Sequence, residues 1–122
     1  MNSVAPAELD NRLQSNDRLY VLDIRPEERY RRNAIDGSDN LPVYDELRGG
    51  DDGALLGQLG EIPPDREVVV VCKMGIVAKR AATLLDEEGY DATVLLGGMS
   101  GWSGYQNNTF TYKLRSLLWK LR

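Results

Sequence analysis

Cys72 is the only cysteine of this 122-residue chain, and it stands where a thiol could do chemistry. Residues 67–71, directly before it, form a short β-branched run that is typical of a buried strand. Residues 78–88 have the composition of a helix, and Gly75 lies between the two segments. A thiol at a strand-to-helix turn faces the first N–H groups of the helix, which can hold a thiolate or another anion. The pattern predicts a reactive cysteine, against the commoner use of free cysteine as a small buried apolar residue.

The chain contains no histidine, and this excludes several kinds of catalytic site. Ser–His–Asp and Cys–His nucleophile pairs cannot form, and neither can zinc sites that use histidine. A reactive Cys72 must therefore be activated by backbone N–H groups, by the helix dipole and by nearby Lys or Arg side chains. We expect no cofactor and no metal, and a single cysteine cannot form an internal disulfide.

Length and charge restrict the class of protein. A chain of 122 residues fits one domain with a hydrophobic core of its own. The net charge of −4 argues against broad nucleic-acid binding, although the last ten residues are locally basic. We find no signal peptide and no apolar segment long enough to cross a bilayer. These features predict a soluble cytoplasmic protein, either a monomer or a homodimer.

Strand and helix patterns alternate along the chain, which predicts an α/β fold. In such a fold a mostly parallel central sheet is covered by helices on both faces, giving three layers. Ligands bind outside the carboxyl ends of the strands, and Cys72 lies at such an end. The expected strands are residues 19–24, 40–42, 67–71 and 92–96, and the expected helices are residues 7–13, 27–32, 78–88, a short one near 55–59 and a short turn that begins at 99–102.

Three separated segments together resemble the single-domain rhodanese family of sulfurtransferases. Residues 22–42 are similar to the first block of the family. Residues 72–77 resemble its six-residue active loop, in which a cysteine leads and a glycine follows three places later. Residues 94–102 resemble the closing block, and the three segments occur in the family's order and spacing. The resemblance implies a rhodanese-like domain over residues 1–105.

The resemblance also implies a reaction and a set of site residues. The Cys72 thiolate would take the outer sulfur of a donor such as thiosulfate, become a persulfide, and pass that sulfur to a thiophilic acceptor, a small thiol or a sulfur-carrier protein. Asp23 and Arg25 would form structural pairs that hold the first block beneath the loop. The substrate-binding residues would be those of the loop and the start of the helix: Lys73, Met74, Gly75, Ile76, Val77 and Ala78.

Two departures from the family pattern leave a second function open. The loop often ends in an arginine that helps to hold an anionic substrate, and here that residue is Val77; the next, often serine, is Ala78. Anion binding must then rely on main-chain N–H groups and on Lys73. The alternative is a binding or regulatory module of the same fold with little turnover. A phosphatase of the related fold is disfavoured, because its arginine would replace Ala78 and the loop is too short. Catalysis further requires that solvent reach Cys72 and that other protein groups leave the loop amides free.

Residues 106–122 form a tail beyond the segments that resemble the family, and residues 112–122 have the pattern of a short amphipathic helix. Three interpretations remain open: packing on its own domain, a dimer contact, or a basic helix that meets a partner or an anionic membrane surface. On a helix, one face would carry Leu114, Leu117, Leu118 and Leu121, and the basic residues Lys113, Arg115, Lys120 and Arg122 would lie mostly elsewhere.

Overall fold

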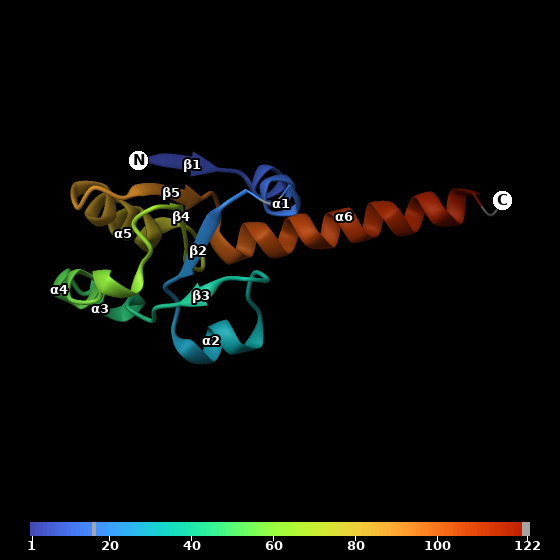
Figure 1. Cartoon of the computed structure of the whole chain (residues 1–122). Coiled ribbons are helices and arrows are strands. Elements are labelled where there is room, and N and C mark those ends of the chain that lie inside the picture. Colours follow the sequence, from blue (N-terminus) through green and yellow to red (C-terminus); the bar gives the residue numbers. More distant parts are fainter. Residues whose placement is uncertain (16, 121–122) are drawn as a thin grey trace.

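The computed structural model describes the backbone of residues 1–15 and 17–120, the side chains up to Thr109, and those of Leu114, Leu117 and Leu118. One five-stranded sheet forms the centre, and every strand pair in it is parallel (Figure 1). The predicted α/β fold is therefore confirmed. The strands, in their order across the sheet, are β1 (Asn2–Val4), β5 (Asp91–Leu95), β4 (Glu67–Val71), β2 (Leu19–Asp23) and β3 (Asp39–Asn40).

Strand β4 is central because its valines are apolar on both faces of the sheet. Val68, Val69, Val70 and Val71 are fully buried, as a continuous β-branched run in a parallel sheet should be. The register places Val71 opposite Asp23 of β2. The carboxyl ends of β2 and β4 therefore lie side by side, and Cys72 follows directly at that edge of the sheet.

Helices cover both faces, as the sequence predicts. On one face, α1 (Pro6–Gln14) and the first turns of α6 (Gly98–Lys120) bury Leu9 and Trp102 against the sheet. The opposite face packs against α3 (Tyr44–Arg48), α4 (Gly53–Leu56) and α5 (Ile76–Glu87). The short helix α2 (Glu27–Arg32) buries no side chain, and a 3₁₀ turn, Leu59–Glu61, leads toward β4.

The largest difference from the sequence prediction is the length of α6. The short helical turn expected near Trp102 is the start of a continuous 23-residue helix, which crosses the expected domain boundary between residues 105 and 106. Gly101 allows this helix to pass close to the preceding turn, because a Cβ there would lie 3.0 Å from the carbonyl oxygen of Leu96. The C-terminal half of α6 extends away from the rest of the molecule (Figure 1).

The described leucines of the tail do not pack on their own domain. Leu114, Leu117 and Leu118 are 46%, 56% and 57% exposed. This exposure differs from the interpretation that the tail packs on its own domain. The interpretations that remain are a dimer contact and a basic helix that meets a partner or an anionic membrane surface. Among the described residues, no helix combines the length and apolar character that crossing a membrane requires.

Candidate functional site

The site is built around the loop that joins β4 to α5. Cys72 follows the last residue of β4, and three residues later Gly75 adopts a left-handed conformation with φ +89°. This turn directs the Gly75 N–H at the sulfur, with 3.0 Å between the nitrogen and Cys72 Sγ. A side chain at position 75 would be strained by the backbone and would approach the carbonyl oxygen of Leu95 at 3.3 Å.

Of the two conditions that catalysis requires, the described part of the chain meets one: the loop amides are free, but solvent does not reach Cys72. Among the described residues, the N–H groups of Met74, Ile76 and Val77 donate no hydrogen bond to another protein group. They remain free to bind an anion. Cys72, however, is only 1% exposed, so the sulfur lies within the loop and not on the surface. The loop residues beside it are open, with Met74 55% and Ile76 74% exposed.

The N-terminus of α6 is hydrogen-bonded to the backbone of the loop. The Met99 N–H donates to the carbonyl oxygen of Cys72 at 2.8 Å, and the Ser100 N–H donates to that of Lys73 at 3.0 Å. Gly98 makes this close approach possible, because a Cβ there would lie 2.3 Å from the Cys72 carbonyl oxygen. The first turn of α6 therefore fixes the backbone that carries the thiol.

Asp23 and Arg25 form the pair that the sequence suggests, at the adjacent end of β2. Their side chains are buried, and Arg25 Nη2 lies 2.7 Å from Asp23 Oδ2. The same nitrogen donates to the carbonyl oxygen of Asn33 at 2.6 Å, and the Asn40 amide donates to the carbonyl oxygens of Asp23 and Arg25. Because its guanidinium already faces Asp23, Arg25 brings no uncompensated charge to the site.

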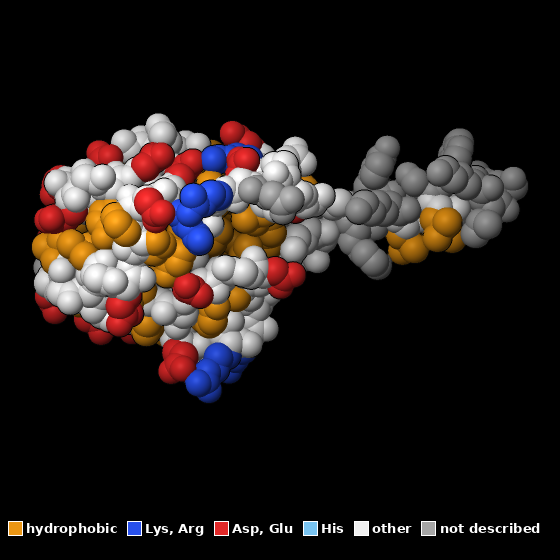
Figure 2. Space-filling view, in the orientation of Figure 1, with side chains coloured by type: hydrophobic (Ala, Val, Ile, Leu, Met, Phe, Trp, Pro, Cys, Tyr) orange, Lys and Arg blue, Asp and Glu red, His pale blue; other side chains and the backbone are white. Residues whose placement is uncertain are grey.

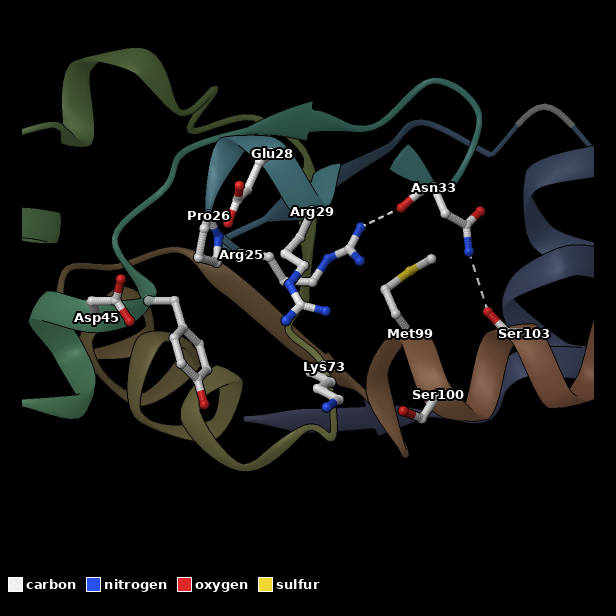
Figure 3. Close-up of a pocket in the computed structure, with 11 residues that line it drawn as sticks. Arg25, Pro26, Glu28, Arg29, Asn33, Asp45, Lys73, Met99, Ser100 and Ser103 are labelled. Atoms are coloured by element: carbon white, nitrogen blue, oxygen red, sulfur yellow. Dashed lines mark hydrogen bonds between the residues drawn. The ribbon is translucent and has the colours of Figure 1, made fainter. Parts of the chain in front are cut away.

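A pocket of about 540 Å³ opens beside the loop. The side chains of Arg29 and Lys73 point into it from α2 and from the active loop (Figure 3). Among the described residues, neither makes an ion pair. Two cations that make no described ion pair thus line this pocket, which meets the loop at Lys73; Cys72 is not among its lining residues. The lining residues are Arg25, Pro26, Glu28, Arg29, Asn33, Tyr44, Asp45, Lys73, Met99, Ser100 and Ser103.

The structure places the predicted loop residues in different surroundings. Lys73 lines the pocket, whereas Met74 and Ile76 form the exposed outer side of the loop. Ala78 is buried in the core, so only its backbone can take part. The sequence did not indicate that Arg29 belongs to the site. It placed this residue only in an expected helix, residues 27–32. Its place in the pocket depends on how α2 folds back over the end of β2, and no local pattern signals that.

Comparison with known proteins identifies the family to which this chain belongs. A model of the rhodanese-like domain matches residues 5–105. The chain belongs to the rhodanese-like domain family. The thiosulfate sulfurtransferase GlpE of Shewanella oneidensis is 35% identical over 85 residues, which cover 69% of this chain and 75% of that protein. A sulfurtransferase of Allochromatium vinosum is 26% identical over 104 residues, covering 84% and 89%.

Solved structures agree with the fold of this rhodanese-like domain. A rhodanese-related protein from Thermoplasma volcanium superposes with a TM-score of 0.71 over 86% of this chain and 93% of its own, at 23% identity. Some other curated relatives are much longer, and this chain spans only about a quarter of their length. The three-layer rhodanese fold predicted from the sequence is confirmed, and the relatives place the chain among sulfurtransferase-like proteins.

Proposed function

We propose that this rhodanese-like domain transfers sulfane sulfur through a persulfide on Cys72, with thiosulfate as a donor. The observation that carries the proposal is the loop itself, where one N–H already faces Sγ at 3.0 Å and three neighbouring N–H groups have no acceptor among the residues that the structure describes. Converging amides of this kind stabilise an anionic sulfur without a histidine or a loop arginine. The name of the relative from Shewanella oneidensis supports thiosulfate as the donor to test first.

The proposed reaction has two balanced steps. The Cys72 thiolate attacks the outer sulfur of thiosulfate, the S–S bond of the donor breaks, and sulfite leaves with the electron pair. The new persulfide carries its negative charge on the terminal sulfur, within reach of the loop amides. A thiolate acceptor then attacks that terminal sulfur, and the Cys72 thiolate is released. The acceptor would be a small thiol or a sulfur-carrier protein.

The pocket would supply the charge that Val77 does not. Among the described residues Arg29 and Lys73 make no ion pair, and both line the pocket, so a dianionic donor such as thiosulfate would gain from both charges. The donor would enter on the side where Lys73, Met74 and Ile76 are exposed. In this proposal Arg29 and Lys73 bind the donor, and the amides bind the sulfur that is transferred.

The burial of Cys72 favours a second candidate function. A thiol that is 1% exposed does not have the solvent access that catalysis requires, and it fits a binding or regulatory module with little turnover. In that case the pocket beside the loop would bind an anionic ligand without reaction. The two functions differ in one measurable event, the formation of a covalent sulfur adduct on Cys72.

Mass spectrometry of the intact protein after thiosulfate treatment distinguishes the two functions. We expect a gain of one sulfur atom, which cyanide or dithiothreitol removes. Cys72→Ser should abolish both the adduct and the turnover, because no other cysteine is present. The free energy of unfolding of this variant serves as the control for folding. A wild-type protein that gains no sulfur, or a folded serine variant with full turnover, would refute the proposal.

A further inference from the structure

The described side chains of the C-terminal part of α6 are not part of the described hydrophobic core. The helix is anchored by its first turns, where Met99 and Trp102 are buried and the Tyr105 hydroxyl donates to Asp10 Oδ2 at 2.7 Å. The family match ends at residue 105, and the helix continues to Lys120. At 1.5 Å per residue, residues 106–120 extend about 22 Å beyond that point. This length of helix is available for contact with something outside the domain (Figure 1).

The described side chains of this segment present an apolar face. Leu114, Leu117 and Leu118 are spaced by three and four residues, so they lie on the same side of the helix. All three are about half exposed, and hydrophobic side chains stand out on the projecting helix (Figure 2). A leucine face of this kind is stabilised when an apolar phase removes it from water.

The charge of the tail is opposite to that of the domain. Lys113, Arg115, Lys120 and Arg122 are basic, and no Asp or Glu follows Asp91. The chain as a whole has 19 acidic and 15 basic residues, so its entire acidic excess lies before residue 92. The tail therefore combines leucines and cations, whereas the domain that carries it is strongly acidic.

An anionic lipid surface matches both properties of the tail. Its acyl layer can accept the leucines, and its phosphate groups can pair with the four cations. Pairing the tails of two copies would instead bring two sets of cations together. The acidic domain is itself repelled by such a surface, and this repulsion is screened over the Debye length of about 8 Å in physiological salt.

We propose that residues 106–122 form a peripheral anchor that lies on membranes containing anionic phospholipids. The helix rests on the surface and does not cross it, in keeping with the basic sequence of residues 106–122. The anchor brings the rhodanese-like domain to the membrane, and the proposal does not depend on the reaction at Cys72.

Sedimentation of the full chain with lipid vesicles tests this proposal. We expect binding to vesicles that contain phosphatidylglycerol, much weaker binding to pure phosphatidylcholine, and a loss of binding as salt is raised. The double variant Leu117→Ser with Leu118→Ser should bind at least about tenfold more weakly, because two leucines no longer leave water. Leu96→Ser is the matched control, since Leu96 is 45% exposed but lies on the domain.

Three results would overturn the anchor. The first is the absence of binding to phosphatidylglycerol vesicles, and the second is an equal loss of binding with Leu96→Ser. The third is a dimer, measured by light scattering without lipid, that the double leucine variant dissociates; this would assign the leucine face to a second copy of the chain. Persulfide formation by the double variant should match the wild type, which separates failure of the anchor from failure of the proposed reaction.

Discussion

Arg29 and Lys73 reach the pocket from different elements, and each brings a charge that no described acidic side chain neutralises by an ion pair. We expect Arg29→Gln or Lys73→Gln to raise the KM for thiosulfate about 5- to 10-fold, since each removes one charge-assisted contact to a dianion. Steady-state kinetics at constant ionic strength measures this effect. Arg31→Gln is the control, because Arg31 lies on the same helix but pairs with Glu27 and is largely exposed. An equal change in the control would assign the effect to general surface charge.

Gly98 controls how closely α6 approaches the active loop. With φ +55° and a virtual Cβ that lies 2.3 Å from the Cys72 carbonyl oxygen and 2.7 Å from that of Lys73, any side chain would push the helix and the loop apart. We expect Gly98→Ala to lower the free energy of unfolding by about 1–3 kcal/mol. Urea denaturation measures this change.

Gly104→Ala is the matched control for that prediction. It lies in the same helix, has ordinary helical backbone, and a Cβ there would meet no atom within 4 Å. The control should be neutral or should stabilise the protein by about 0.5–1 kcal/mol, as alanine does within helices. If the two variants unfold at the same urea concentration, the close contact at Gly98 is not important for stability.

A partly buried ion pair joins helix α1 to strand β4, and a hydrogen bond joins the same glutamate to strand β5. Arg12 Nη2 lies 2.7 Å from Glu67 Oε1, and the hydroxyl of Thr93 donates to Glu67 Oε2 at 2.6 Å. The hydrogen bond from Arg12 holds the pKa of Glu67 below its ordinary value of 4.5. Because this pKa is lowered by folding, the pair stabilises the protein fully above the ordinary value, and the contribution is lost as the pH falls through the folded pKa.

We expect Glu67→Gln to lower the free energy of unfolding by about 1 kcal/mol near neutral pH, after allowance for the partial exposure of the pair. The difference from wild type should shrink as the pH falls below the ordinary glutamate pKa. Chemical denaturation at several pH values measures it. Asp65→Asn is the control, because Asp65 pairs with Arg18 at 3.5 Å with both side chains exposed. A pH-independent difference would mean that the charge of Glu67 does not stabilise the fold.

The strands and helices nearest Cys72 could be predicted because their patterns are local. The valine run of β4 and the alanine- and leucine-rich α5 each signal one type of element over their whole length. Strand β1 was missed because it has three residues, two of them exposed, and its pairing with β5 joins the two ends of the domain. The sequence predicts only a short turn at 99–102, because glycines such as Gly101 and Gly104 lower helix propensity, whereas the structure continues the helix through them.

The candidate site could be predicted only where its residues lie close together in the sequence. The cysteine, the glycine turn and the Asp23–Arg25 pair lie within short segments, so spacing and residue type were enough to suggest them. The burial of Cys72 and the place of Arg29 depend on contacts between distant segments. A sequence pattern can thus suggest a candidate nucleophile but not its accessibility or the charges around it.

The protein consists of an acidic domain and a projecting basic helix, so the two parts should respond differently to truncation. Because Leu114, Leu117 and Leu118 are exposed, deletion of residues 111–122 removes no described core contact. We expect the free energy of unfolding to change by less than about 0.5 kcal/mol, as for surface changes in general. Denaturation of the shortened chain measures it. A clear loss of stability would show that the tail packs on its own domain after all.

Helix α6 also links the two ends of the molecule mechanically. Its first turn donates hydrogen bonds to the carbonyl groups of Cys72 and Lys73, and the same unbroken helix continues to Lys120. No hinge separates the two regions along the described helix. A contact that fixes the far end of α6 therefore also fixes the orientation of the loop that carries Cys72, and with it the direction from which a ligand can approach that loop.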